Sequence, residues 1–251
     1  MATKRDDRKH VAVVVYPGLT MLELIGTISA LDGLGMKTGF RTVTVGERRE
    51  PLESDTPMRF IPQSTYDETP HPFAVLVPGS GGLRAITAMG DEKLLAYVRA
   101  AAEGAELVAS VGSGALILAA AGLLAGRRAT THWAYRRVLE NLGATYVQRR
   151  WVEDDRFITA GGASGGIDMA LHLVGNDTGR RSARQVQLWI EYDPQPPFGA
   201  IDRQREDADN ALASTLAGRH AEVERALAHR PDLLAAVEKA LSPAPPNGIR
   251  L

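Results

Sequence analysis

A short apolar segment, Leu107–Val111, leads into the corner Gly112-Ser113-Gly114, and a helix of small and aliphatic residues is expected to follow as far as Leu124. The sequence of strand, sharp turn and helix is typical of a nucleophile elbow, which holds one side chain at the carboxyl edge of a parallel sheet. The amides of a helix N-terminus lie beneath that side chain. Here the position of the nucleophile falls on Gly112, which has no side chain. The pattern therefore predicts an active-site corner that lacks the group expected to react there.

Further apolar segments repeat the alternation of strand and helix. Residues 11–16, 40–45 and 73–77 are expected to be strands, and residues 20–34 and 91–103 are expected to be helices. A continuous apolar strand is typical of a parallel sheet that is covered on both faces. Strands that alternate with helices predict an α/β fold with a mostly parallel central sheet.

Three parts are expected along the chain: a polar N-terminal tail (1–10), an α/β domain (11–200) and a C-terminal helical extension (201–251). Residues 205–241 are rich in alanine and have helical spacing. These helices either pack on the domain or on a second subunit, or they form a DNA-binding module. Their mixed charge and the lack of a helix-turn-helix pattern disfavour the DNA-binding module.

Composition limits the possible chemistry and partners. The chain has no cysteine, which excludes disulfides, thiolate metal sites and thiol catalysis. A net charge of −1 gives no reason to expect nucleic acid or an anionic membrane as a partner. No apolar run is long enough for a membrane span, and the polar first ten residues predict no secretory signal. We therefore expect a cytoplasmic protein. The six histidines show no metal-ligand spacing, so no metal is expected.

Glu23 is a lone carboxylate in the otherwise apolar segment 19–26. If it is buried, desolvation raises its pKa and lets it hold a proton near neutral pH, as a general acid or base requires. The alternatives are a helix face turned to solvent and a carboxylate that caps backbone amides.

Two further features are expected at the same edge of the sheet. The turn that contains Gly81 and Gly82 could present backbone N–H groups to a developing negative charge. Ser113 either caps the following helix or acts as a nucleophile, which requires a base within hydrogen-bond reach. His132 is either that base or a packed histidine without a catalytic role.

Seven segments taken together resemble the PfpI-like branch of the class I glutamine amidotransferase-like superfamily, in particular the bacterial isonitrile hydratases and the sensor domains of AraC-type regulators. They span about residues 10–200 in family order. The segments are Tyr16-Pro17-Gly18 with Leu22-Glu23-Leu24, 77–82, 110–115, 120–124, 129–133, 161–168 and 187–198. The resemblance implies a flavodoxin-like three-layer sandwich, which usually forms a homodimer.

The resemblance also assigns positions to the family's functional residues. The catalytic cysteine of the family falls on Gly112, its acidic partner on Glu23, the hydroxyl residue after the cysteine on Ser113, and a histidine on His132. The nucleophile is thus missing while its neighbours remain. Glycine adopts the strained backbone of an elbow without cost. Its lack of a side chain is expected to leave space in front of Glu23 for a substrate atom or a water molecule.

The leading hypothesis is an enzyme that needs no cofactor and acts on a small organic molecule as a lyase, hydratase, isomerase or cyclase. Glu23 would be the general acid/base, and Ser113 and His132 would orient the substrate. The expected substrate-binding residues are Tyr16, Gly81, Gly82, Gly112, Trp133 and Ile167. Two alternatives remain: a non-catalytic ligand-binding or sensor protein, and a serine hydrolase that uses Ser113 with His132.

Overall fold

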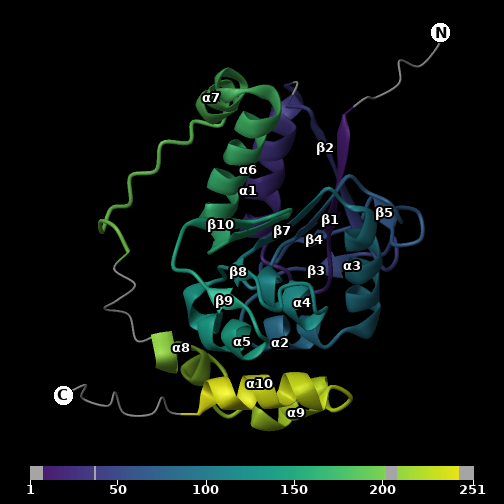
Figure 1. Ribbon diagram of the computed structural model, residues 1–251, viewed down its shortest axis with the longest axis vertical. Coiled ribbons are helices and arrows are strands. Elements are labelled where there is room, and N and C mark those ends of the chain that lie inside the picture. Colours follow the sequence, from purple (N-terminus) through teal and green to yellow (C-terminus); the bar gives the residue numbers. More distant parts are fainter. Residues whose placement is uncertain (1–7, 37, 202–207, 243–251) are drawn as a thin grey trace.

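A seven-stranded sheet forms the centre of the computed structural model, which describes residues 8–36, 38–201 and 208–242 (Figure 1). The strand order is β10-β11-β7-β6-β1-β2-β5, and only β10 runs antiparallel to its neighbour. The strands are β1 (Lys9–Val14), β2 (Phe40–Gly46), β5 (Ser64–Thr65), β6 (Ala74–Val77), β7 (Leu107–Val111), β10 (Trp151–Asp154) and β11 (Phe157–Ala160). The predicted mostly parallel sheet is confirmed.

Helices cover both faces of this sheet (Figure 1). One layer contains α1 (Met21–Asp32), α6 (Ala163–Thr178) and α7 (Arg180–Trp189), with α1 packed against α6 and α6 against α7. The other contains α2 (Leu83–Met89), α3 (Glu92–Gly104), α4 (Gly114–Ala120) and α5 (Arg136–Asn141). Every residue of β6 and of α4 is buried, because these two elements lie in the middle of the sandwich. The flavodoxin-like three-layer arrangement is therefore confirmed.

Smaller elements differ in part from expectation. β3 (Leu52–Glu53) pairs with β4 (Arg59–Phe60), and β8 (Arg128–Ala129) pairs with β9 (Thr145–Tyr146). Two short 3₁₀ helices are present, η1 (Gly33–Gly35) and η2 (Trp133–Tyr135). The sequence predicted a strand end at 129–133, but β8 ends at Ala129. The imidazole of His132 instead accepts a hydrogen bond from the Ala134 amide, which caps the start of η2. Helix α2 was not expected, because the glycine turn before it hides its start.

In its described residues, the C-terminal extension forms three helices, α8 (Ala208–Thr215), α9 (His220–Leu227) and α10 (Pro231–Leu241). They pack on the α/β domain itself: α8 contacts η2, α9 contacts α2, and α10 contacts α5. Figure 1 shows them side by side beneath the layer that contains α2 and α5. The expected helices are thus confirmed, apart from residues 205–207, which lie outside the described residues. In the described part of the chain, no helix is both long and apolar enough to cross a bilayer.

Candidate active site

Two glycine-containing turns meet at the carboxyl edge of the sheet, one after β6 and one after β7. A Cβ atom on Gly79 would stand 2.6 Å from the amide nitrogen of Ser113, and one on Gly114 would stand 2.0 Å from the carbonyl oxygen of Val77. Such distances leave no room for any side chain at either position. Glycine is therefore required here for close backbone approach, which brings the two turns into direct contact.

The corner residue Gly112 directly follows β7 and has a φ of +54°, a conformation that favours glycine. Its N–H donates to the carbonyl of Ala160 at 3.0 Å, and its own carbonyl accepts from the Thr131 hydroxyl at 2.9 Å. Both bonds tie the corner to the chain around β11 and β8. The backbone has the sharp turn of an elbow, as the sequence predicted.

The carboxyl group of Glu23 fills the position that a side chain on Gly112 would occupy. A Cβ atom on Gly112 would lie 2.2 Å from Glu23 Oε1, and Glu23 Oε2 accepts from the Gly79 N–H at 2.5 Å. Glu23 is only 5% exposed. The expectation of open space in front of Glu23 is therefore wrong, because the long glutamate side chain itself lies over the glycine.

Burial raises the pKa of Glu23 to about 8, with the neighbouring Asp55 carboxylate adding to the increase and the Gly79 N–H acting against it. At neutral pH the group is therefore mostly protonated, yet both of its forms are accessible close to pH 7. Removing the proton leaves a carboxylate that still accepts the Gly79 hydrogen bond. Such a group can donate and accept a proton, as general acid/base chemistry requires.

Ser113 does not have the geometry of either role proposed for it from sequence. It precedes α4, but its hydroxyl makes no capping bond to that helix. Instead Oγ accepts from the Ser80 N–H at 2.8 Å and donates to the Ser80 carbonyl at 2.6 Å. The hydroxyl proton of Ser113 is thus used in the bond to the Ser80 carbonyl, and Ser113 is only 3% exposed. The hydroxyl joins the two turns, while His132 caps η2.

The glycine turn at 79–82 uses several of its amides within the protein. Gly82 donates to the hydroxyl of Tyr135 at 2.6 Å, and Gly79 and Ser80 donate to side chains as described above. Tyr16 is buried below this turn, where its hydroxyl donates to the Pro78 carbonyl at 2.8 Å. The Gly82 amide, proposed from sequence as an oxyanion donor, is thus already bonded.

A cavity of about 860 Å³ lies next to this cluster. Three of the residues expected from the sequence to bind substrate are in its wall, namely Tyr16, Gly81 and Gly82. The wall also contains Thr20, which immediately precedes α1 and lies three positions before Glu23. The other predicted site residues, namely Glu23, Gly112, Ser113, His132, Trp133 and Ile167, are not among its lining residues.

Trp133 and Ile167 are placed away from this wall by their own elements. Trp133 begins η2, and its ring lies 5.4 Å from that of His132, measured between centroids. Ile167 is on α6 and packs against α1, where its Cγ1 lies 3.1 Å from the place that a Cβ on Gly26 would occupy. Ile167 thus joins α6 to α1, and neither residue is in the wall of this cavity, so their role in substrate binding stays a prediction.

Sequence reasoning missed several groups at the cavity. Asp55, Arg84, Thr215 and Arg219 are in the wall, and Tyr135 holds the Gly82 amide. Tyr135 follows His132 closely in the chain, so its place near the site could have been suspected. Asp55 and Arg219 come from a charged loop and from the extension, where no sequence pattern marks them.

One group of side chains in the described residues has metal-ligand geometry. The ligand atoms of His220, Glu224 and Glu238 lie within 4.8 Å of one another. All three residues are exposed on the C-terminal extension, and none is in the wall of the cavity. They have no part in the candidate active site.

Residues 9–176 match the sequence pattern of the DJ-1/PfpI family. The chain belongs to the DJ-1/PfpI family. The resemblance inferred from sequence is confirmed, and the match covers the two turns, Glu23 and the corner at Gly112. The C-terminal extension lies beyond the matched residues.

Individual relatives agree with this assignment. The chain is 38% identical to the isonitrile hydratase of Pseudomonas putida over 75% of its own length and 81% of the relative's. It is 33% identical to the HTH-type transcriptional regulator CdhR of Pseudomonas aeruginosa, over 57% of this chain and 40% of the regulator. Among solved structures, a ThiJ/PfpI family protein from Pseudomonas syringae superposes with a TM-score of 0.73 at 30% identity, covering 91% of this chain and 90% of the other.

Proposed function

We propose that this protein is a cofactor-independent enzyme that catalyses proton-transfer chemistry on a small organic molecule, with Glu23 as general acid/base. One observation carries the proposal: a buried carboxyl with a pKa raised to about 8 lies over Gly112 and accepts the Gly79 N–H. Perturbed carboxyls in a concave site are candidates for acid/base catalysis. The similarity to an isonitrile hydratase supports a hydratase-type reaction.

Hydration of an isonitrile illustrates the chemistry that such a group can support. The proton of Glu23 passes to the terminal isonitrile carbon, and the oxygen of a water molecule adds to the same carbon. Loss of one water proton to the Glu23 carboxylate regenerates the acid, and tautomerisation gives the N-substituted formamide. The sum is addition of one water molecule, and no thiol adduct is formed. Dehydration, isomerisation and cyclisation use the same proton transfers.

The cavity gives a substrate a route to this group. Thr20 is in the cavity wall and begins the turn of helix on which Glu23 lies, while Gly81 and Gly82 continue from the turn that holds its carboxyl. We infer that rotation of the Glu23 side chain toward Thr20 brings the carboxyl to a bound substrate. Residues 79–82 would then face the reacting atoms from the opposite side.

The test compares Glu23→Gln with Glu103→Gln, an exposed glutamate on α3 that serves as the control. Isonitriles and a panel of small unsaturated carbonyl compounds are incubated with each protein, and products are followed by mass spectrometry. Glu23→Gln retains an acceptor for the Gly79 N–H but has no proton to transfer, so turnover should fall by about 10²-fold or more. Undiminished turnover in Glu23→Gln would remove Glu23 from the mechanism.

A second candidate function is ligand binding without catalysis. The observation in its favour is that the cavity wall contains Tyr16, Gly81 and Gly82 but not Glu23 or Gly112. Part of a transcriptional regulator is also among the relatives. A compound that raises the melting temperature and is recovered unchanged after long incubation supports this function, whereas recovery of a product excludes it.

The serine hydrolase hypothesis receives less support, because the proton of Ser113 is donated to the Ser80 carbonyl. An organophosphonate probe tests it directly. Labelling at Ser113, identified by peptide mass spectrometry, would restore this hypothesis.

A further inference from the structure

Two residues of the C-terminal extension stand in the wall of the cavity, although the extension lies outside the residues that match the family pattern. These are Thr215, the last residue of α8, and Arg219, which directly precedes α9. Thr215 closes on the glycine turn: its Cγ2 lies 3.3 Å from the place of a Cβ on Gly82. The extension therefore borders the cavity beside the turn.

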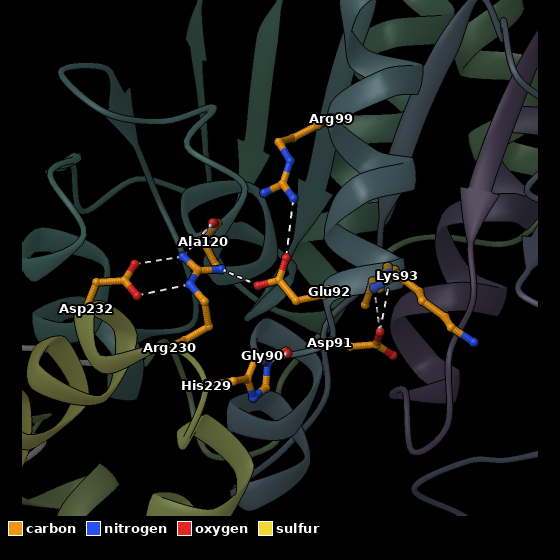
Figure 2. Close-up of polar contacts among 10 residues, drawn as sticks. Gly90, Asp91, Glu92, Lys93, Arg99, Ala120, His229, Arg230 and Asp232 are labelled. Carbon is orange, nitrogen blue, oxygen red and sulfur yellow. Dashed lines mark hydrogen bonds and ion pairs between the residues drawn. The ribbon is translucent and has the colours of Figure 1, made fainter.

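Polar contacts hold this wall against the α/β domain. Figure 2 shows Arg230 between two carboxylates, with Nη1 2.9 Å from Glu92 Oε1 and Nη2 2.7 Å from Asp232 Oδ2. His229 Nε2 lies 2.8 Å from the Gly90 carbonyl oxygen. Because Arg230 and His229 belong to the extension while Glu92 and Gly90 belong to the domain, the Arg230–Glu92 and His229–Gly90 contacts fix one to the other.

A second attachment lies on α5. The Arg137 guanidinium donates to the carbonyls of Ser242 at 2.7 Å and Lys239 at 3.1 Å, and the Asn141 side chain donates to the Ala236 carbonyl at 2.9 Å. The extension is thus held at two separate places, by α5 and by the loop before α3. A wall held at two places keeps a defined distance from the glycine turn.

Arg219 retains donors that can serve a ligand. Its Nε and Nη2 bond the two carboxylate oxygens of Glu222 at 3.4 and 3.0 Å, which orients the planar guanidinium and leaves Nη1 available. The second arginine in the wall, Arg84, donates to the Ser54 carbonyl. Both cations present N–H groups and no acceptors.

The acidic residues in the same wall are already engaged by the protein. Asp55 accepts from the Met21 amide, Asp91 caps the N-terminus of α3, and Glu53 pairs with Arg59. These contacts hold the carboxylates in place, while Nη1 of Arg219 remains available next to Thr215. A hydrogen-bond acceptor on a ligand can therefore bind at Arg219.

We propose that the extension is a working part of the binding site, in which Thr215 limits the size of the ligand and Arg219 recognises a carbonyl or carboxylate oxygen on it. The ligand class is a small molecule with an apolar body and an oxygen acceptor at one end. The proposal rests on the proposed function only where it calls this ligand a substrate. Arg219 is a specificity-determining residue and takes no part in proton transfer.

The absence of cysteine from the chain provides a direct test. Thr215→Cys introduces a single thiol in the wall, and Ser214→Cys introduces one at the adjacent exposed position, which is not in the wall. Each protein is equilibrated with two probes, each of which is a disulfide between cysteamine and an N-acylated cysteamine. The acyl group is 4-carboxybenzoyl in one probe and benzoyl in the other. The protein thiolate displaces cysteamine and forms a disulfide with the probe, so no oxidant is consumed. Capture is measured by intact-protein mass spectrometry against increasing 2-mercaptoethanol.

At Thr215→Cys the carboxylate probe should be captured about tenfold better than the benzoyl probe, because a charge-assisted bond to Arg219 favours it. At Ser214→Cys the two probes should be captured equally. Adding Arg219→Gln to Thr215→Cys should abolish the preference, and adding Arg225→Gln, an exposed arginine of α9 outside the wall, should leave it unchanged.

Equal capture of the two probes at Thr215→Cys, or a preference that survives Arg219→Gln, would overturn the proposal. Circular dichroism melting curves for each variant show whether the fold is retained. Arg219→Lys keeps the charge but not the planar donor set, so it should restore only part of the preference for the carboxylate probe. Because capture requires no turnover, its failure is independent of the role of Glu23.

Discussion

The two sides of the cavity are built in different ways. On the side of the sheet, the turn at 79–82 borders the cavity and touches the turn at 112–114 behind it, where Gly79 and Gly114 leave no room for side chains. On the side of the extension, Arg230, His229 and Arg137 hold helices through side-chain bonds. A glycine at which two backbones touch tolerates almost no substitution. A residue that holds a helix through a side-chain bond can be substituted while the other bonds remain. We infer that the chemistry is fixed by the first side while ligand choice can change through the second.

The largest expected effect is at Gly114. Gly114→Ala would place Cβ 2.0 Å from the Val77 carbonyl oxygen, so the turns must separate at a cost of at least about 3 kcal/mol of unfolding free energy. The control is Gly104→Ala at the end of α3, where a Cβ meets no atom within 4 Å. Urea unfolding measures both. A Gly114→Ala protein as stable as the wild type would contradict the backbone contact.

The next effect concerns pH and Glu23. Burial raises the pKa of Glu23 to about 8 from its ordinary value of 4.5, so between these pH values the folded protein binds one more proton than the unfolded chain. The contribution of protonated Glu23 to the free energy of unfolding is therefore fully present below pH 4.5. It is lost as the pH rises to about 8.

Glu23→Gln stays neutral and should remove this loss, which makes the variant more stable than the wild type by a few kcal/mol at alkaline pH. Urea unfolding between about pH 5 and pH 9 measures the difference, with Glu103→Gln as the exposed control. A difference between wild type and Glu23→Gln that does not grow with pH would show that Glu23 ionises normally.

A smaller loss of stability is expected for Gly112→Ala. The new Cβ meets Glu23 Oε1 at 2.2 Å and φ is +54°, whereas Gly122→Ala at φ +81° meets nothing within 4 Å. Gly122→Ala should cost about 1 kcal/mol from backbone strain alone, and Gly112→Ala about 1–2 kcal/mol more because the carboxyl must move. Thermal unfolding of the pair separates the two contributions. Equal losses would mean that Glu23 does not occupy the corner.

The smallest effect on global stability is expected for Arg230→Gln, about 1 kcal/mol or less, because its partners are exposed. Hydrogen exchange should nevertheless become faster in α9 and α10, since one of the two attachments is weakened and only the His229–Gly90 contact remains there. Arg225→Gln serves as the matched control. Unchanged exchange after Arg230→Gln would show that apolar packing alone holds the extension.

Local sequence pattern was sufficient for the parts of the molecule in which neighbours in the chain are neighbours in space. The apolar strand Leu107–Val111 and the corner at Gly112 are formed as expected, and so are the helices of the extension. The sequence left the burial of Glu23 open, because apolar neighbours do not decide it: Leu22 and Ile25 in the same segment are exposed. Its protonation near neutral pH follows from that burial.

Contacts between distant segments could not be predicted in the same way. The Glu23 side chain is long enough for its carboxyl to reach Gly112, so the corner is filled and not open. Ser113 bonds Ser80 because two turns 33 positions apart touch. Thr215 and Arg219 reach the cavity because α8 docks on η2 and α9 docks on α2. The proposed domain boundaries at residues 10 and 200 remain predictions.

Because the Glu23 carboxyl lies over Gly112, it competes with any ligand that would bind at this corner. A ligand that reaches the corner must displace a carboxyl tethered within the same molecule, at an effective concentration that no dilution lowers. The apparent dissociation constant is then the intrinsic constant divided by the fraction of molecules in which the carboxyl has turned away. Alkaline pH should increase that fraction, because burial disfavours the ionised form of the Glu23 carboxyl at the corner. Occupancy of the corner is thereby coupled to proton concentration before any reaction begins.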